Sequence, residues 1–149
     1  MAKITNEIIY ETNDIYGLLD FLCLNMYEEE NQNIMEDNII PKYIRNVLYI
    51  LEFETVFEME GLYIDTYLLN GEEYKIDRYI EAFKDTGNNE MAEYINECRK
   101  LFIEIGESDY WFYFEEIEWE ELENKIGEII DDKKFWNNVI KYIEENRGK

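Results

Sequence analysis

Three long stretches of this chain carry many acidic residues and almost no basic ones. Residues 4–41 contain nine acids and no base, and residues 46–74 contain seven acids and no base. Residues 104–132 contain twelve acids and a single base, Lys125. Because like charges repel one another in a compact chain, this distribution opposes folding unless a large apolar core offsets it. It also predicts at least one strongly negative face on the folded protein.

The composition is that of a chain able to form such a core. Of the 149 residues, 46% are hydrophobic and 16% are aromatic, although the formal net charge is -22. These values separate the chain from disordered acidic tails, which lack aromatic and branched aliphatic residues. The length predicts one domain that spans residues 1–149.

The spacing of the apolar residues predicts helices along almost the whole chain. After Pro41, which suits the first turn of a helix, Ile44, Val47, Leu48 and Leu51 recur on one helical face. The single proline and seven glycines favour long helices over many tight turns. We therefore expect an all-α fold, a single compact domain of about six to eight helices. The expected segments are a first helix capped by Thr5 or Asn6 and broken near Gly17, residues 41–60, a short helix through Leu69, 76–84, 91–105, 119–130, and a last helix capped by Asp131 or Asp132.

Histidine is absent and cysteine is scarce. The lack of histidine excludes catalysis by a histidine dyad or triad and removes the commonest zinc ligand. Cys23 and Cys98 are too few for a disulfide scaffold, and we expect two reduced, buried thiols, with one disulfide as the alternative. No signal peptide and no membrane span are recognisable, which predicts a cytoplasmic protein. The negative charge argues against direct binding to nucleic acid or to an anionic membrane through a basic patch.

The densest acidic cluster lies between residues 115 and 123. On a helix, Glu116, Glu120 and Glu123 share one stripe, and carboxylates at this spacing repel one another. A solvated surface is one explanation of such a run. The other explanation is a functional use of the acidic run, because a run this one-sided opposes folding.

Metal binding is one such use. All-α nucleotide pyrophosphatases hold magnesium with paired acidic motifs on two helices, and Glu115 with Glu118 and Glu128 with Asp131 resemble those pairs. A continuous helix from 118 to 128 would separate them by about 15 Å, too far to share one ion. A carboxylate–metal nucleotide pyrophosphatase is therefore the least favoured function, and we expect no catalytic residue, no metal and no cofactor.

Recognition of a basic protein is the other use. Carboxylates three or four residues apart on a helix have Cβ atoms about 5–6 Å apart, and duplex DNA presents a charge about every 1.7 Å of its axis. Rows of carboxylates can therefore imitate phosphates. We predict a non-enzymatic inhibitor that occupies the DNA-binding surface of a basic DNA- or RNA-binding protein, such as a repressor, a nuclease or a phage-defence effector. The predicted contact residues are Glu115, Glu116, Glu118, Glu120, Glu121 and Glu123, followed by Glu52, Glu54, Glu58 and Glu60.

The segment 51–102 adds a resemblance to this prediction. Its helices are separated by turns in an order that resembles the central region of a family of small acidic all-helical bacterial proteins, whose best-known member is a dimeric DNA mimic. The residues at matching places are Glu54 or Glu58, Gly61, Asn70 and Gly87. Glu60-Gly61-Leu62 departs from the Gly-Gly-Phe usual in that family. Because the imitation of DNA in that family rests on surface acids and not on a fixed motif, no individual functional residue transfers. The resemblance implies a helical fold, a possible homodimer, and binding to a DNA-binding protein in place of DNA.

Two alternatives remain open at this point. An immunity protein that neutralises a nuclease toxin needs the same acidic face against a basic cleft. A helical interaction module whose acidity serves solubility predicts weak or salt-insensitive binding to basic proteins.

Overall fold

Every regular element in the part of the chain that the structure describes is helical. The computed structural model describes residues 2–36, 38–60, 73–107 and 119–147, and these contain seven α-helices and one short 3-10 helix. The elements are α1 (Asn6–Glu11), α2 (Ile15–Asn25), η1 (Glu29–Asn31), α3 (Lys42–Glu60), α4 (Glu73–Asp85), α5 (Asn89–Glu107), α7 (Trp119–Asp131) and α8 (Lys133–Arg147). The all-α prediction is therefore confirmed, and the short helix expected before Leu69 lies outside the described residues.

Local capping residues place several helix ends where the sequence predicts them. The Thr5 hydroxyl accepts a hydrogen bond from the Ile8 amide at 3.2 Å at the start of α1. The Asp132 carboxylate accepts a hydrogen bond from the Lys134 amide at 3.0 Å at the start of α8. The prediction of a break near Gly17 is wrong. The break comes earlier, because Asp14 accepts from the Tyr16 amide and starts a new helix in which Gly17 is an interior residue.

The turn between α4 and α5 has the geometry that a glycine allows. Gly87 has a φ of 81°, a conformation that side chains with a Cβ rarely adopt. The Asn88 amide donates to the Phe83 carbonyl at 2.8 Å and the Gly87 amide donates to the Lys84 carbonyl at 3.0 Å. This pair of bonds is a Schellman motif, which ends α4 and lets α5 fold back beside it.

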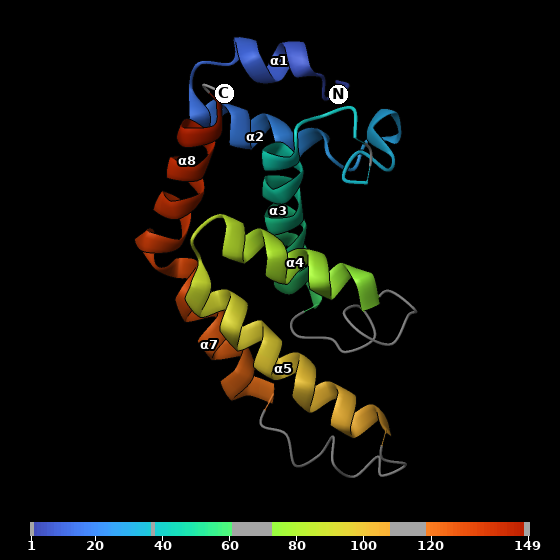
Figure 1. Ribbon diagram of the computed structural model, residues 1–149, viewed down its shortest axis with the longest axis vertical. Helices are drawn as coiled ribbons and strands as arrows, with labels where there is room; N and C mark the ends of the chain where they lie inside the picture. Colours follow the sequence, from blue (N-terminus) through green and yellow to red (C-terminus); the bar gives the residue numbers. More distant parts are fainter. Residues whose placement is uncertain (1, 37, 61–72, 108–118, 148–149) are drawn as a thin grey trace.

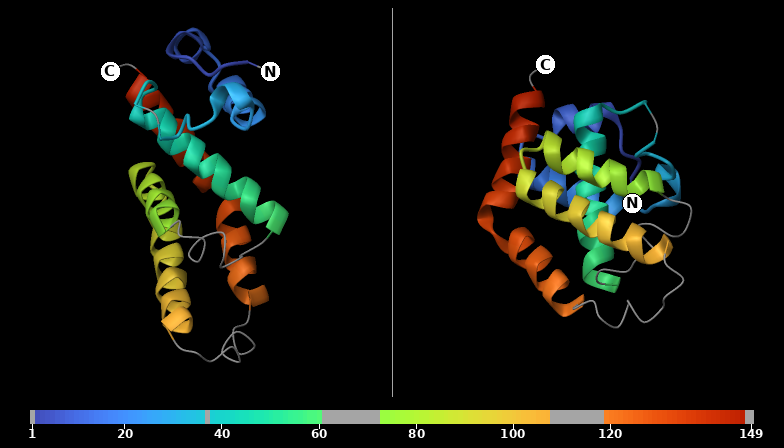
Figure 2. Two further views of the ribbon diagram at one scale, coloured as in Figure 1. Left: turned by 90° about the vertical axis from the view of Figure 1, so that its right-hand side faces the viewer. Right: turned by 60° about the horizontal axis from the view of Figure 1, so that its bottom comes forward.

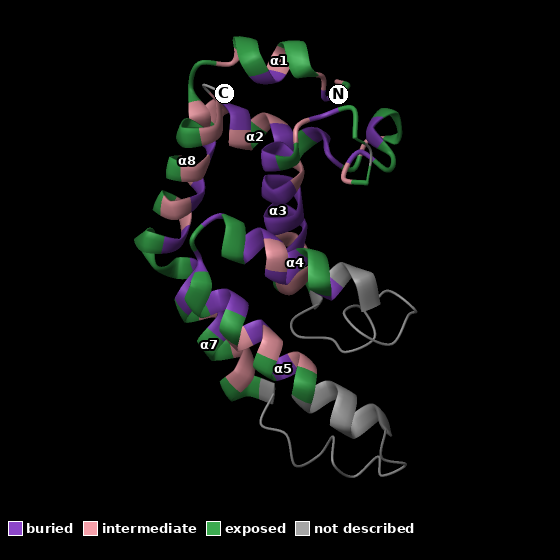
Figure 3. Ribbon diagram, viewed as in Figure 1, coloured by how far each residue is buried: buried purple, intermediate pink, exposed green. Residues whose placement is uncertain are grey.

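Helix α3 is the centre of the fold. It packs against α2, α4 and α8, and the contacts continue from α4 to α5, from α5 to α7 and from α7 to α8 (Figure 1). Five helices therefore close a ring, and α1 and α2 lie across one end of it (Figure 2). Because neighbours surround α3, most of its residues between 43 and 53 are buried (Figure 3). A helix enclosed in this way is apolar on nearly all sides.

Side chains from distant segments tie the two ends of the described chain together. The Arg147 guanidinium at the end of α8 donates to the Ile9 and Tyr10 carbonyls at 2.9 and 3.2 Å, where α1 ends. A cation is stabilised at that end of a helix. Asn31, which is 1% exposed, accepts from the Ile4 amide at 2.8 Å and donates to the Ala2 and Asn25 carbonyls. These bonds hold the first residues against the end of α2.

The two cysteines have different surroundings. Both are free thiols, and Cys98 is buried as predicted, but Cys23 is exposed. That part of the prediction is wrong because α2 turns Leu18 and Leu22 toward the core, and Cys23 lies one residue further round the helix. Among the described helices, none is both long enough and apolar enough to cross a membrane.

Candidate functional site

An acidic groove runs between the C-terminal half of α3 and α7. Its lining includes Glu58 from α3 and Glu123, Glu128 and Asp131 from α7. Phe57, Asn124 and Gly127 complete the lining, and no lysine or arginine of the described residues contributes to it. Figure 2 shows the end of α3 beside α7 in both of its views. We call this surface the acidic groove.

The acidic groove joins the two rows of acids that the sequence analysis proposed as separate contact surfaces. Glu58 comes from the predicted contact residues between 52 and 60, and Glu123 comes from those between 115 and 123. Glu120 and Glu121 are exposed one turn earlier on α7. Of the other predicted residues, Glu115, Glu116 and Glu118 lie outside the described part of the chain, and for Glu60 the structure describes only the helical backbone.

Glu52 does not belong to this surface. It is 5% exposed and accepts a hydrogen bond from the Tyr79 hydroxyl at 2.6 Å. Tyr79 is itself 1% exposed, so the pair lies in the core between α3 and α4. The prediction of Glu52 as a contact residue is therefore corrected: the packing of α4 against α3 covers this position, and a buried carboxylate needs the donor that Tyr79 supplies.

Glu54 does not line the groove, but the charges of two groove residues act on it. Burial, together with the charges of Glu58 and Asp131, raises the pKa of the Glu54 carboxyl to about 7. Since Glu54 belongs to α3 and Asp131 to α7, the fold brings acids of these two helices within electrostatic range of each other. Near neutral pH the charge of this face therefore depends on whether Glu54 holds a proton.

The exposed side of α2 borders the same negative region. Burial raises the pKa of the Cys23 thiol, and the charges of Glu54, Asp20 and Glu58 add to that effect. Since thiolate formation adds a negative charge, this direction is what neighbouring carboxylates produce. Acids of α3 and α2 therefore both act on the exposed side of α2.

Glu128 and Asp131 are groove residues that the contact prediction left out. The sequence analysis weighed them only as metal ligands. The signal that identifies Asp131 is helical spacing, because Glu123, Gly127 and Asp131 follow one another at four-residue intervals on one stripe of α7. The part of the chain that the structure describes holds no group of three acidic or cysteine side chains arranged to bind a metal ion.

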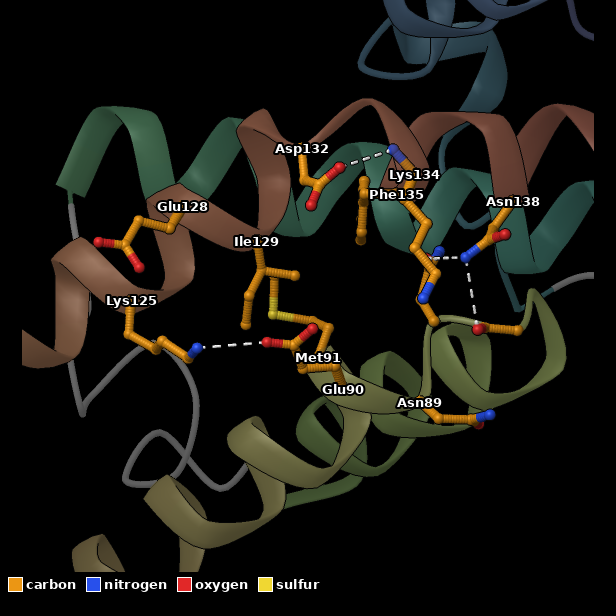
Figure 4. A pocket seen from close by; sticks show the side chains of 12 residues that line it. Asn89, Glu90, Met91, Lys125, Glu128, Ile129, Asp132, Lys134, Phe135 and Asn138 are labelled. Atoms are coloured by element: carbon orange, nitrogen blue, oxygen red, sulfur yellow. Dashed lines mark hydrogen bonds and ion pairs between the residues drawn. The ribbon is translucent and has the colours of Figure 1, made fainter.

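A second cavity lies at the corner between α5, α7 and α8, and its charges are mixed (Figure 4). Lys125 forms an ion pair with Glu90 at 3.2 Å across its mouth. Asn138 donates to the Asn88 side chain at 2.9 Å at the other end. Charges of both signs therefore meet in this cavity, whereas the charged residues that line the acidic groove are all acidic.

Comparison of the chain with protein-family models, with curated proteins and with solved structures found no match.

Proposed function

We propose that this protein mimics nucleic acid and binds a basic DNA- or RNA-binding protein through the acidic groove. The observation that carries the proposal is the convergence of Glu58, Glu123, Glu128 and Asp131 on one open groove whose described lining residues include no lysine or arginine. Repulsion between these carboxylates costs folding free energy. A partner that supplies lysine and arginine side chains removes that cost on binding.

The arrangement of the carboxylates supports mimicry over a general acidic surface. Two helices supply the charges from the two sides of the groove, much as two strands supply the phosphates of a duplex. A cleft lined by one sign of charge focuses the electrostatic field and accelerates association with a partner of opposite charge. The resemblance of residues 51–102 to the acidic DNA-mimic family points in the same direction.

An immunity protein against a nuclease toxin would use the same groove. The identity of the partner distinguishes this alternative from an inhibitor of a repressor or of a phage-defence effector. The experiment below therefore identifies the partner before it measures inhibition.

The test compares three immobilised proteins in a lysate of the source cells at low salt. These are the wild type, a groove variant in which Glu58, Glu123 and Glu128 become glutamine and Asp131 becomes asparagine, and a control variant. The control neutralises four exposed acids outside the groove by the substitutions Glu7→Gln, Glu29→Gln, Glu93→Gln and Glu144→Gln. Both variants have the same net charge, so they differ only in where the charge was removed.

We expect the wild type and the control to retain one nucleic-acid-binding protein, identified by mass spectrometry. Duplex DNA, or salt raised from about 50 to 200 mM, should release it, because such contacts weaken steeply with salt. The groove variant should bind the purified partner at least tenfold more weakly. Equal loss in both variants, or retention of a broad set of basic proteins, would show that only net charge matters and would refute the proposal.

A further inference from the structure

A third groove has a charge balance unlike that of the rest of the molecule. It lies between residues 35, 36 and 38, the start of α3 and the exposed side of α4, and has a volume of about 540 Å³. Lys42, Arg45 and Arg78 line it, against two acids, Glu36 and Glu81. Acids outnumber bases by 36 to 14 in the chain, and they also outnumber bases in the other two grooves. We call this surface the basic groove.

Carboxylates of α4 hold two of the three cations. The Lys42 ammonium lies 2.8 Å from the nearer Glu81 oxygen and 3.8 Å from an Asp85 oxygen. Arg78 lies 4.0 Å from the other Glu81 oxygen. The hydrogen bond and charge of Lys42, together with the charges of Arg78 and Arg45, lower the pKa of the Glu81 carboxyl. Glu81 is therefore charged and shared among the cations around it.

Arg45 is the exception among these cations. The ion pairs and side-chain hydrogen bonds of the described residues leave its guanidinium without a partner, and its Nε atom is buried. A buried N–H without an acceptor destabilises the fold. Because the Nε atom is closed off from solvent, the donors that Arg45 can offer to a ligand in the groove are its Nη groups.

The surroundings of Arg45 favour an anion as that ligand. Arg45 lies in the first turns of α3, where the helix dipole contributes partial positive charge. Lys42 and Arg78 add positive charge to the same groove, and Asn38 adds an uncharged amide. A guanidinium offers a planar fork of donors that fits the oxygens of a phosphate or a carboxylate.

We propose that the basic groove binds a small oxyanion, a phosphate or a carboxylate, with Arg45 as its principal donor. The oxygens of the ligand would accept from the Nη groups of the Arg45 guanidinium, beside the positive charges of Lys42 and Arg78. This proposal does not depend on mimicry of nucleic acid, because the basic groove and the acidic groove have no lining residue in common.

The test is a titration of the full chain with inorganic phosphate and, separately, with acetate, at constant ionic strength set by sodium chloride. The readout is the NMR signal of the Arg45 Nε–H group, assigned by its loss in Arg45→Gln. We expect a saturable shift with at least one of the two ions. The same titration of Arg45→Gln, followed through the backbone amides of α3, should show binding weakened at least tenfold.

Arg99→Gln is the matched control, because Arg99 is paired with Asp77 and does not line the basic groove. It should bind the ion as the wild type does. Shifts that do not saturate with either ion, or equal binding by Arg45→Gln, would overturn the proposal. Binding that emerges only in Asp37→Asn would overturn it too, because a carboxylate of the chain itself would then occupy the site.

Discussion

Replacement of Glu54 by glutamine is expected to stabilise the protein above neutral pH and to leave its stability unchanged in mild acid. Glutamine has nearly the same shape but never carries the charge that burial and the neighbouring acids disfavour. The folded state raises the pKa of Glu54 from 4.5 to about 7. The folded protein therefore holds this proton more tightly than the unfolded chain. The contribution of Glu54 to stability is complete below pH 4.5 and is lost as the pH rises through about 7.

The size of the effect follows from the same values. One pKa unit corresponds to about 1.4 kcal/mol, so the difference between 4.5 and about 7 sets an upper limit of roughly 3 kcal/mol. Because solvent reaches part of the Glu54 side chain, screening reduces the expected gain to about 1–2 kcal/mol at pH 8. For a chain of this length, this gain corresponds to an increase in Tm of about 2–8 °C.

The assay is urea unfolding of both proteins, followed by circular dichroism, at pH 4.5 and at pH 8. Glu93→Gln is the control, because it removes one negative charge from an exposed position on α5. We expect Glu54→Gln to exceed the wild type only at pH 8 and the control to show a smaller change. An equal difference from the wild type at both pH values would refute the argument, since the effect would then not come from ionisation of Glu54.

Three further predictions concern the stability of the fold and are all measured by urea unfolding. Tyr79→Phe removes the donor to the buried Glu52 carboxylate and should cost about 1–3 kcal/mol; a change below 0.5 kcal/mol, roughly the scale of a neutral surface substitution, would contradict the role given to this bond. Asn31→Ala breaks three hydrogen bonds that hold the first residues, and we expect a loss of about 2–3 kcal/mol together with faster proteolysis near the N-terminus; unchanged proteolysis would argue against this anchoring. Gly87→Ala should destabilise by about 1 kcal/mol because of its positive φ, whereas Gly127→Ala, inside α7 and with open space around it, should stabilise by about 0.5–1 kcal/mol; the same sign for both would refute the backbone argument.

The helices themselves could be predicted from the sequence because their signals are local. Apolar spacing, the Thr5 and Asp132 caps, Pro41 and the turn at Gly87 all act within a few residues, and the structure confirms them. The predicted break at Gly17 is wrong because a capping hydrogen bond, and not a glycine, decides where α2 begins. Asp14 supplies a capping hydrogen bond that starts a helix, and a glycine inside a helix only weakens it.

The acidic character of a face was likewise visible in the sequence, but the choice of acids was not. Glu52 and Glu58 belong to one acidic run on α3, yet Glu52 lies in the core and Glu58 lines the acidic groove. Helical periodicity determines which residues share a stripe. It does not determine which stripe a neighbouring helix covers, and the packing of α4 against α3 decides that.

The structure alone decided which distant residues act together. Glu58 and Asp131 are far apart in the sequence and reach one groove because the ring of helices returns α7 to the side of α3. The raised pKa of Glu54 follows from the same packing, and so does the burial of the Arg45 Nε atom without an acceptor among the described residues. The sequence by itself therefore determined the helices and the sign of the charge, because both depend on neighbours along the chain. The tertiary structure decided the sites, because burial and charge–charge interactions depend on distance in space.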